Sequence, residues 1–139
     1  MNKLSSAQNE KALRITRGAD QVLVCDRCRV AESFYSRFVG LMGTLEMSEG
    51  EGLLITRCRE IHMWWMKISI DAVFVKAVEC ESGVQVKHLK AFEVVKLVPN
   101  LRPWRILPVG ARGATDTLEL PAGTIVRTGM QRGDILCIN

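Results

Sequence analysis

Residues 71–79 read DAVFVKAVE, a run in which alanine, valine and phenylalanine dominate. β-Branched and aromatic side chains favour extended backbone, and a short apolar run of this kind is typical of a β-strand. The triplet Glu81-Ser82-Gly83 follows at once and contains residues that favour turns. The pattern therefore predicts a strand over 71–79 that turns back into a second strand.

Further strands are expected on both sides of this run. Short segments in which apolar and β-branched residues alternate with polar ones recur at 12–16, 21–30, 53–57, 84–90, 91–98, 115–120 and 135–138. Two short helices are expected between them, at about 33–42 and about 122–130. Because the strands outnumber the helices and do not alternate with them, the sequence predicts a mainly β fold, either a compact β-sandwich or a barrel-like single domain.

The length of the chain fits one domain. Its 139 residues are enough to bury about two-thirds of the unfolded surface around one core. Residues 1–11 are mostly polar and offer little surface to pack. We therefore expect a flexible N-terminal tail over 1–11 and a single domain over 12–139.

Composition and charge limit the compartments and the classes of partner that we expect. The formal net charge is only +4 and the 19 basic residues are spread along the chain, so nucleic acid is not an expected partner. No apolar run approaches the roughly 20 residues that span a bilayer, and no secretory signal pattern is found. The odd number of five cysteines favours reduced thiols over a disulfide framework. We therefore expect a cytoplasmic protein, as a monomer and without a membrane span.

Three motifs in order connect the chain to a known family. They are RFVGLMG at 37–43, IHMWWMKISIDAVFV at 61–75, and LELPAG at 118–123 followed by Gly133-Asp134. This series resembles the DUF192 family of uncharacterised bacterial and archaeal proteins, and PNLRPWR at 99–105 is similar to a further pattern of that family. The resemblance implies a compact β fold, no established reaction and, for some relatives, a link to envelope, pilus or secretion systems. It provides a counterpart for Cys58 but none for Cys25 and Cys28.

The segment 99–108, PNLRPWRILP, is the main surface candidate. Arg102 and Arg105 flank Trp104, and the prolines stiffen the backbone. Arginine binds a carboxylate or phosphate through two parallel hydrogen bonds, and tryptophan commonly anchors a binding surface. The alternative is a long connection in which Trp104 closes one end of the fold while both arginines are solvated.

We expect this loop to meet the segment that leads into the 71–79 strand. The predicted ligand-binding residues are His62, Trp64, Lys67, Asp71, Arg102, Trp104 and Arg105. A basic, aromatic-lined cleft of this kind would suit a small anionic ligand or an acidic peptide of a protein partner. The protein would then be a small binding or accessory module and not an enzyme. The alternative for Asp71 is a structural role, capping a loop or pairing with a cation.

A second hypothesis uses the soft ligands of CREIHMWWMK at 58–67. Cys58 and His62 could share zinc or Cu(I), and Cys25 with Cys28 would complete a four-ligand metal site or form a redox pair. The protein would then depend on a metal or on thiol chemistry. The alternative is that these cysteines, like the neighbouring methionines, pack in the core.

Enzymatic chemistry finds little support in the sequence. There is no GxSxG, P-loop, GxGxxG or HExxH motif, and no cofactor is expected. The nucleophile–base pair that can be drawn, Cys58 and His62, would lie roughly 13 Å apart along an extended strand. In the same extended arrangement Trp64 and Trp65 would point to opposite faces.

Glu119 stands between two leucines of the 115–120 strand. Alternation places it opposite Leu118 and Leu120. We expect it either to face solvent or to be buried with a partner such as Arg105 or Arg112, because an unpaired buried carboxylate is costly.

Overall fold

The structure is a computed structural model that describes residues 12–33, 41–79 and 90–138. The strands in these ranges are β1 (Leu13–Arg17), β2 (Leu23–Ala31), β3 (Glu51–Ile55), β4 (Glu60–Ile61), β5 (Ile70–Glu79), β6 (Lys90–Leu101), β7 (Val109–Gly110), β8 (Asp116–Pro121) and β9 (Ile135–Ile138). The helix found in the same ranges is α2 (Thr124–Thr128). None of the described residues forms a helix with the length and apolar character that crossing a membrane requires.

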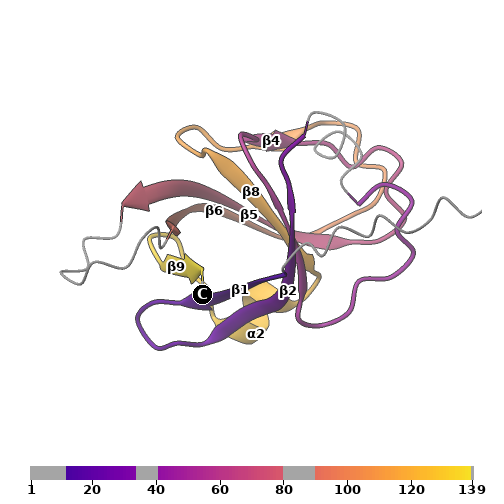
Figure 1. Ribbon diagram of the computed structural model, residues 1–139. Coiled ribbons are helices and arrows are strands. Elements are labelled where there is room, and N and C mark those ends of the chain that lie inside the picture. The colour runs from indigo at the N-terminus through magenta and orange to yellow at the C-terminus, as the bar shows by residue number, and fades with distance from the viewer. Residues whose placement is uncertain (1–11, 34–40, 80–89, 139) are drawn as a thin grey trace, which may run out of the picture.

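Seven of the strands form a closed barrel in the order β1-β2-β3-β8-β5-β6-β9. Figure 1 shows them curving around a common centre. Neighbouring strands are antiparallel, except that β2 and β3 run parallel. Strand β9 pairs with both β1 and β6, so the first and last described strands complete the wall. The mainly β fold predicted from the sequence is confirmed, in its barrel form.

Two apolar cores lie on the two sides of this wall. The first fills the barrel interior and receives side chains from every barrel strand, among them Ile15, Val24, Leu54, Val73, Phe92, Leu118 and Leu136. The second lies outside the wall, under the connections that flank β4 and β7. Strand β5 serves both, with Val73 and Val75 inside and Ala72 and Phe74 outside. Burial on both faces explains why the sequence of β5 is apolar without alternation.

A two-stranded sheet made of β4 and β7 covers the outer core. Ile61 pairs with Val109, and both side chains are buried in that core. Segment 62–69 follows β4 and segment 102–108 precedes β7, so this pairing brings the two segments together. In Figure 1, β4 lies on the side of the molecule opposite to α2.

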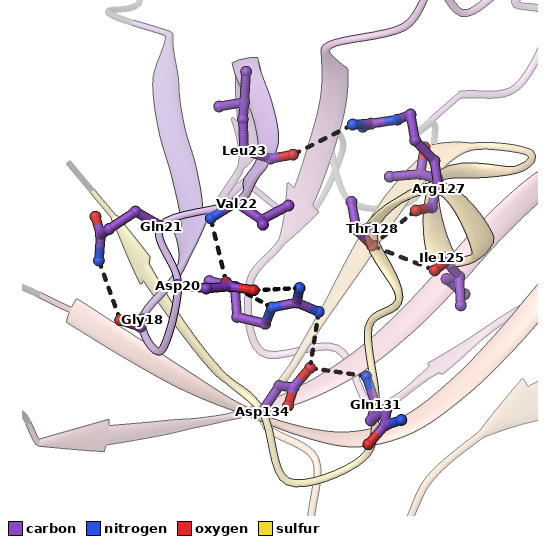
Figure 2. Close-up of polar contacts among 12 residues, drawn as sticks. Gly18, Asp20, Gln21, Val22, Leu23, Ile125, Arg127, Thr128, Gln131 and Asp134 are labelled. Atoms are coloured by element: carbon purple, nitrogen blue, oxygen red, sulfur yellow. Dashed lines mark hydrogen bonds and ion pairs between the residues drawn. The ribbon is translucent and has the colours of Figure 1, made fainter.

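Helix α2 closes one end of the barrel. Ile125 and, just beyond the helix, Met130 belong to the interior core. Gly129 ends the helix in the left-handed conformation, with φ of 64°. A polar cluster beside this end ties the strands to the helix, since the Arg127 guanidinium donates to the Leu23 carbonyl oxygen at 3.5 Å. Figure 2 shows this contact and places Asp134 where it accepts the Gln131 N–H at 2.8 Å.

Several predicted boundaries differ from the structure. Of the helix predicted at 33–42, residues 34–40 lie outside the described residues, and Leu41–Gly43 form a turn. Residues 84–89 of the next predicted strand and the predicted tail at 1–11 also lie outside them. The helix predicted at about 122–130 is shorter, because Pro121 ends β8 and Gly123 takes φ of 97°.

Strand β6 runs past its predicted end at Val98. One extra residue on β6 forms a bulge, since Ile70 pairs with Leu101 while Ala72 pairs with Val98. A bulge is one of the few places in a sheet that accept proline, here Pro99. The proline was therefore a poor guide to where this strand ends.

Candidate functional site

Trp64 and Trp65 lie on a tight turn. The Met66 N–H donates to the Met63 carbonyl oxygen at 3.2 Å, and Trp65 has φ of 66°. A positive φ at the third position defines a type II turn. Both methionines are buried while the two tryptophans are 48% and 62% exposed. The segment is thus not extended here, and the turn projects both tryptophans outwards in place of the opposite faces that an extended segment would give them.

The loop at 102–108 packs against this turn. The Trp104 N–H donates to the Met63 carbonyl oxygen at 3.1 Å, and the Trp64 indole N–H donates to the Ile106 carbonyl oxygen at 2.9 Å. The rings of Trp65 and Trp104 meet edge to face, with centroids 5.5 Å apart. Two segments separated by about 40 residues in sequence thus form one exposed surface.

We call this surface the Trp–Arg surface. It consists of Trp64, Trp65, Lys67, Arg102, Trp104, Arg105, Ile106 and Leu107. Its cationic side chains are exposed, and among the described residues they form no ion pair. Trp104 is 57% exposed, and Ile106 and Leu107 at the loop tip are 78% and 69% exposed. Exposed apolar side chains gathered in this way mark an interaction surface more often than scattered ones do.

Two of the three tryptophans stand on left-handed backbone. Trp104 has φ of 61°, close to that of Trp65. For a residue with a side chain this conformation costs about 1–2 kcal/mol, and bulky residues seldom adopt it. Such strain is concentrated at ligand clamps and active sites in proteins. Its presence under both rings of the edge contact supports a role for this surface in binding.

Of the remaining two predicted binding residues, His62 lies against the Trp–Arg surface and Asp71 lies apart from it in the interior. His62 is half-buried, with its ring 5.1 Å from the Trp64 ring. Asp71 is fully buried, and its carboxylate accepts the Asn100 N–H and the Ile125 N–H, each at 2.8 Å. This carboxylate holds the β6 bulge and the start of α2 to β5. We therefore leave Asp71 out of the proposed binding surface.

Comparison with known proteins gives the chain a family. The model of the DUF192 family, described as uncharacterized ACR, matches residues 14–138. The chain belongs to the DUF192 family. A UPF0127 protein of Thermococcus sibiricus is 33% identical over 113 residues, which is 78% of this chain and 63% of that protein. The chain thus spans less than two-thirds of the length of this curated relative.

Two solved structures share the fold of this DUF192 protein. A protein of unknown function from Novosphingobium aromaticivorans has a TM-score of 0.68 and 22% identity, with 89% of this chain and 81% of that chain covered. A Sinorhizobium meliloti protein proposed as a transcription regulator has a TM-score of 0.64 and 22% identity, with 89% of each chain covered. At this level of identity the likeness concerns the fold alone.

The three cysteines and the histidine of the metal hypothesis do not form one site. Cys25 and Cys28 point into the barrel interior, because a bulge in β2 turns both to the same side. Cys58 packs against the outer core, and its thiol donates to the Glu60 carbonyl oxygen at 3.1 Å. The barrel wall separates the two pairs. Among the described residues, no three His, Cys, Asp or Glu side chains are arranged to hold a metal.

The two thiols of the interior are hydrogen-bonded to each other. This hydrogen bond and burial together raise the pKa of Cys25 well above its usual value, and the same hydrogen bond lowers the pKa of Cys28. Both side chains are fully buried in this DUF192 protein. A lowered pKa favours a reactive thiolate, but burial in the core closes both sulfurs off from a partner protein or a metal ion.

Glu119 is buried in the outer core. It pairs across the sheet with Leu53 and Ala72, and its side chain is 5% exposed. Its Oε2 atom has no hydrogen-bond partner among the described residues, and burial raises the pKa of the carboxyl to about 7. The expectation that a buried Glu119 would pair with Arg105 or Arg112 is wrong, since both arginines are exposed.

Three residues of the Trp–Arg surface lie inside the candidate segments but are not among the predicted ligand-binding residues. For Trp65, the apolar Met63 and Met66 three residues apart fit a turn as well as a strand. Ile106 and Leu107 belong to the candidate loop at 99–108. The sequence signal for this apolar pair is its position between Trp104-Arg105 and Pro108, where no strand is expected.

Proposed function

We propose that this DUF192 protein is a non-enzymatic binding module whose Trp–Arg surface binds an acidic, partly apolar segment of a protein partner. The observation that carries this proposal is the pair Trp65 and Trp104. Both rings are more than half exposed, they contact each other, and both stand on left-handed backbone. Glycine would meet the backbone requirement at lower cost. Tryptophan at both positions therefore supports a role for these rings in binding a partner, not in stabilising the fold.

The projecting shape of the surface favours a protein segment over a small anionic ligand. Small-molecule sites enclose most of the ligand surface in a concave pocket. Here the tip residues Ile106 and Leu107 stand out from the loop with most of their surface in solvent. Tryptophan and arginine are also the residue types that dominate the energetic centres of protein interfaces.

Charge defines the composition of the partner segment. Residues 61–70 and 101–109 contain Lys67, Arg102 and Arg105 but neither aspartate nor glutamate. Carboxylates of the partner would pair with these cations, with two parallel hydrogen bonds to each arginine. Apolar partner residues would cover the tryptophans and the loop tip. The affinity should therefore fall as salt screens the charges.

We further propose the cytoplasm as the compartment of this interaction. The odd number of five cysteines supports a reducing environment. A subunit of an envelope, pilus or secretion assembly is the partner class that the family resemblance implies, and its cytoplasmic segments are the first to test.

A selection from a random peptide library displayed on phage tests the proposal. The full chain is immobilised in reducing buffer, and the peptides that it enriches are sequenced and synthesised. We expect these peptides to combine aspartate or glutamate with aromatic or aliphatic residues. Enriched peptides without acidic residues contradict the proposal.

Trp104→Gly supplies the matched variant, because glycine accepts the left-handed backbone. A tryptophan side chain of about 200 Å² that is 57% exposed offers about 110 Å² for burial, or about 3 kcal/mol at 25 cal/mol per Å². Loss of the side chain should weaken binding by about 100-fold. Arg105→Glu should also weaken binding, whereas Arg132→Glu, in an exposed turn before β9, should not. Equal affinities of the wild type and Trp104→Gly would refute the assignment.

A further inference from the structure

The barrel has one closed end and one hollow end. Helix α2 fills the closed end with Ile125, while a cavity of about 440 Å³ lies at the opposite mouth. Every barrel strand contributes to its lining, from Leu13 of β1 to Ile138 of β9. The mouths of β-barrels are common places for small ligands, and this volume lies within the usual range for ligand pockets.

The lining of this cavity is mostly apolar. The larger apolar side chains are Leu13, Val30, Leu54, Val78, Phe92 and Ile138. Leu54 and Phe92 are also part of the interior core, so the floor of the cavity is the core itself. An apolar ligand would therefore extend the packing of the barrel interior.

The polar groups of the lining are predominantly acidic. They are Glu32, Thr56 and Asp116, and no lysine, arginine or histidine stands among the described residues that line the cavity. A carboxylate in apolar surroundings is best compensated by a cation that donates hydrogen bonds. The lining thus selects for positive charge on a ligand.

Asp116 is held in a fixed position. One carboxylate oxygen accepts the Arg57 N–H at 3.2 Å, and the other accepts the Thr115 hydroxyl at 2.6 Å. The residue is only 8% exposed. A carboxylate has room for about four hydrogen bonds, so these two contacts orient Asp116 and leave capacity for a ligand donor. Glu32 is exposed and lies at the rim.

We propose that the hollow end of the barrel binds a small apolar molecule that carries one protonated amine. The amine donates to Asp116 and Glu32, and the apolar part packs on Leu54 and Phe92. None of the lining residues belongs to the Trp–Arg surface. A test of this site is therefore independent of the proposed protein partner.

An NMR titration of the full chain with three matched probes tests the site. The probes are hexylammonium, hexan-1-ol and hexanoate, which share the alkyl chain and differ in charge. We expect saturable shifts of the Val30, Ala77 and Phe92 amides with hexylammonium. Its affinity should exceed that of hexan-1-ol by about 10-fold or more, the size of one hydrogen bond to a charged group, and hexanoate should bind most weakly. Equal affinities for hexylammonium and hexanoate, or shifts centred away from the mouth, overturn the proposal.

Two variants locate the binding groups. Ala77 lines the cavity with an exposed side chain, and Ala77→Phe should fill the space and weaken binding of hexylammonium at least about 10-fold. The matched control is Ala19→Phe, in the exposed turn between β1 and β2, which should bind as the wild type does. Glu32→Gln alters only an exposed rim residue and should reduce the preference for hexylammonium over hexan-1-ol. The amine site is refuted if Glu32→Gln leaves the preference for hexylammonium over hexan-1-ol unchanged and Ala77→Phe leaves the affinity for hexylammonium unchanged.

Discussion

The buried carboxyl of Glu119 should make the stability of the protein depend on pH in an unusual direction. Most carboxylates in folded proteins have a lowered pKa and stabilise the fold as pH rises. Burial instead raises the pKa of Glu119 to about 7, from a usual value of 4.5. The folded state therefore holds this proton more tightly than the unfolded state does. The stability is fully present below the unfolded pKa and is lost as pH rises through the folded pKa.

The size of the effect follows from the two values. A shift from 4.5 to about 7 corresponds to about 3 kcal/mol at 1.36 kcal/mol per pKa unit. Between about pH 5 and about pH 8, the contribution of Glu119 should fall by about 2–3 kcal/mol. Glu119→Gln keeps the shape of the side chain and cannot ionise, so it should lose this dependence.

Urea denaturation followed by tryptophan fluorescence measures the effect. The free energy of unfolding of Glu119→Gln minus that of the wild type should increase by about 2–3 kcal/mol from about pH 5 to about pH 8. The matched control is Glu46→Gln, whose side chain is exposed and whose difference from the wild type should change little with pH. A Glu119→Gln difference that is constant with pH would refute the view that this carboxyl is buried without compensation.

Three further predictions follow from contacts described above. Asp71→Ala should lower the free energy of unfolding by about 3–5 kcal/mol, because the buried N–H of Ile125 and the part-buried N–H of Asn100 lose their acceptor. A loss below about 1 kcal/mol in urea denaturation would argue against that role. Trp104→Gly should change the free energy of unfolding by less than about 1 kcal/mol in the same assay, because relief of the left-handed strain offsets the lost ring contact. A loss above about 3 kcal/mol would show that the ring stabilises the fold and is not reserved for binding. Maleimide labelling read by mass spectrometry should modify Cys58 in the native protein well before Cys25 and Cys28, and equal rates would show that the interior thiols are accessible.

Local patterns predicted the strands well because each strand is encoded by neighbouring residues. The apolar run of β5 and the turn-and-strand ending at Gly133-Asp134 both appear in the structure where expected. Local patterns could not predict the order of the strands in the barrel, because they do not specify which strands pair. Strand β8 lies between β3 and β5, and the parallel pairing of β2 with β3 is set by packing across the whole chain.

The candidate site was predicted in part. Residue type and loop placement led us to expect the 99–108 loop beside the segment that leads into β5, and the Trp64 indole N–H donates to the Ile106 carbonyl oxygen across the two segments. That these residues bind a ligand stays a prediction. The sequence does not indicate the left-handed backbone of Trp65 and Trp104, because glycine is the residue that normally marks such positions and tryptophan does not. The burial of Glu119, with its Oε2 atom unpartnered among the described residues, was also unpredictable, because alternation gives a face of the strand and not what covers it.

The seam between β1 and β9 has a consequence for how the protein is made. Because β9 contributes the last four residues of the wall, a ribosome must finish residues 135–138 before the barrel can close. Until then β1 and β6 each present an open sheet edge that would pair with any other exposed strand. Nascent chains on crowded ribosomes are therefore most prone to aggregate before β9 has been made. The final strand converts that vulnerable open sheet into a wall without edges.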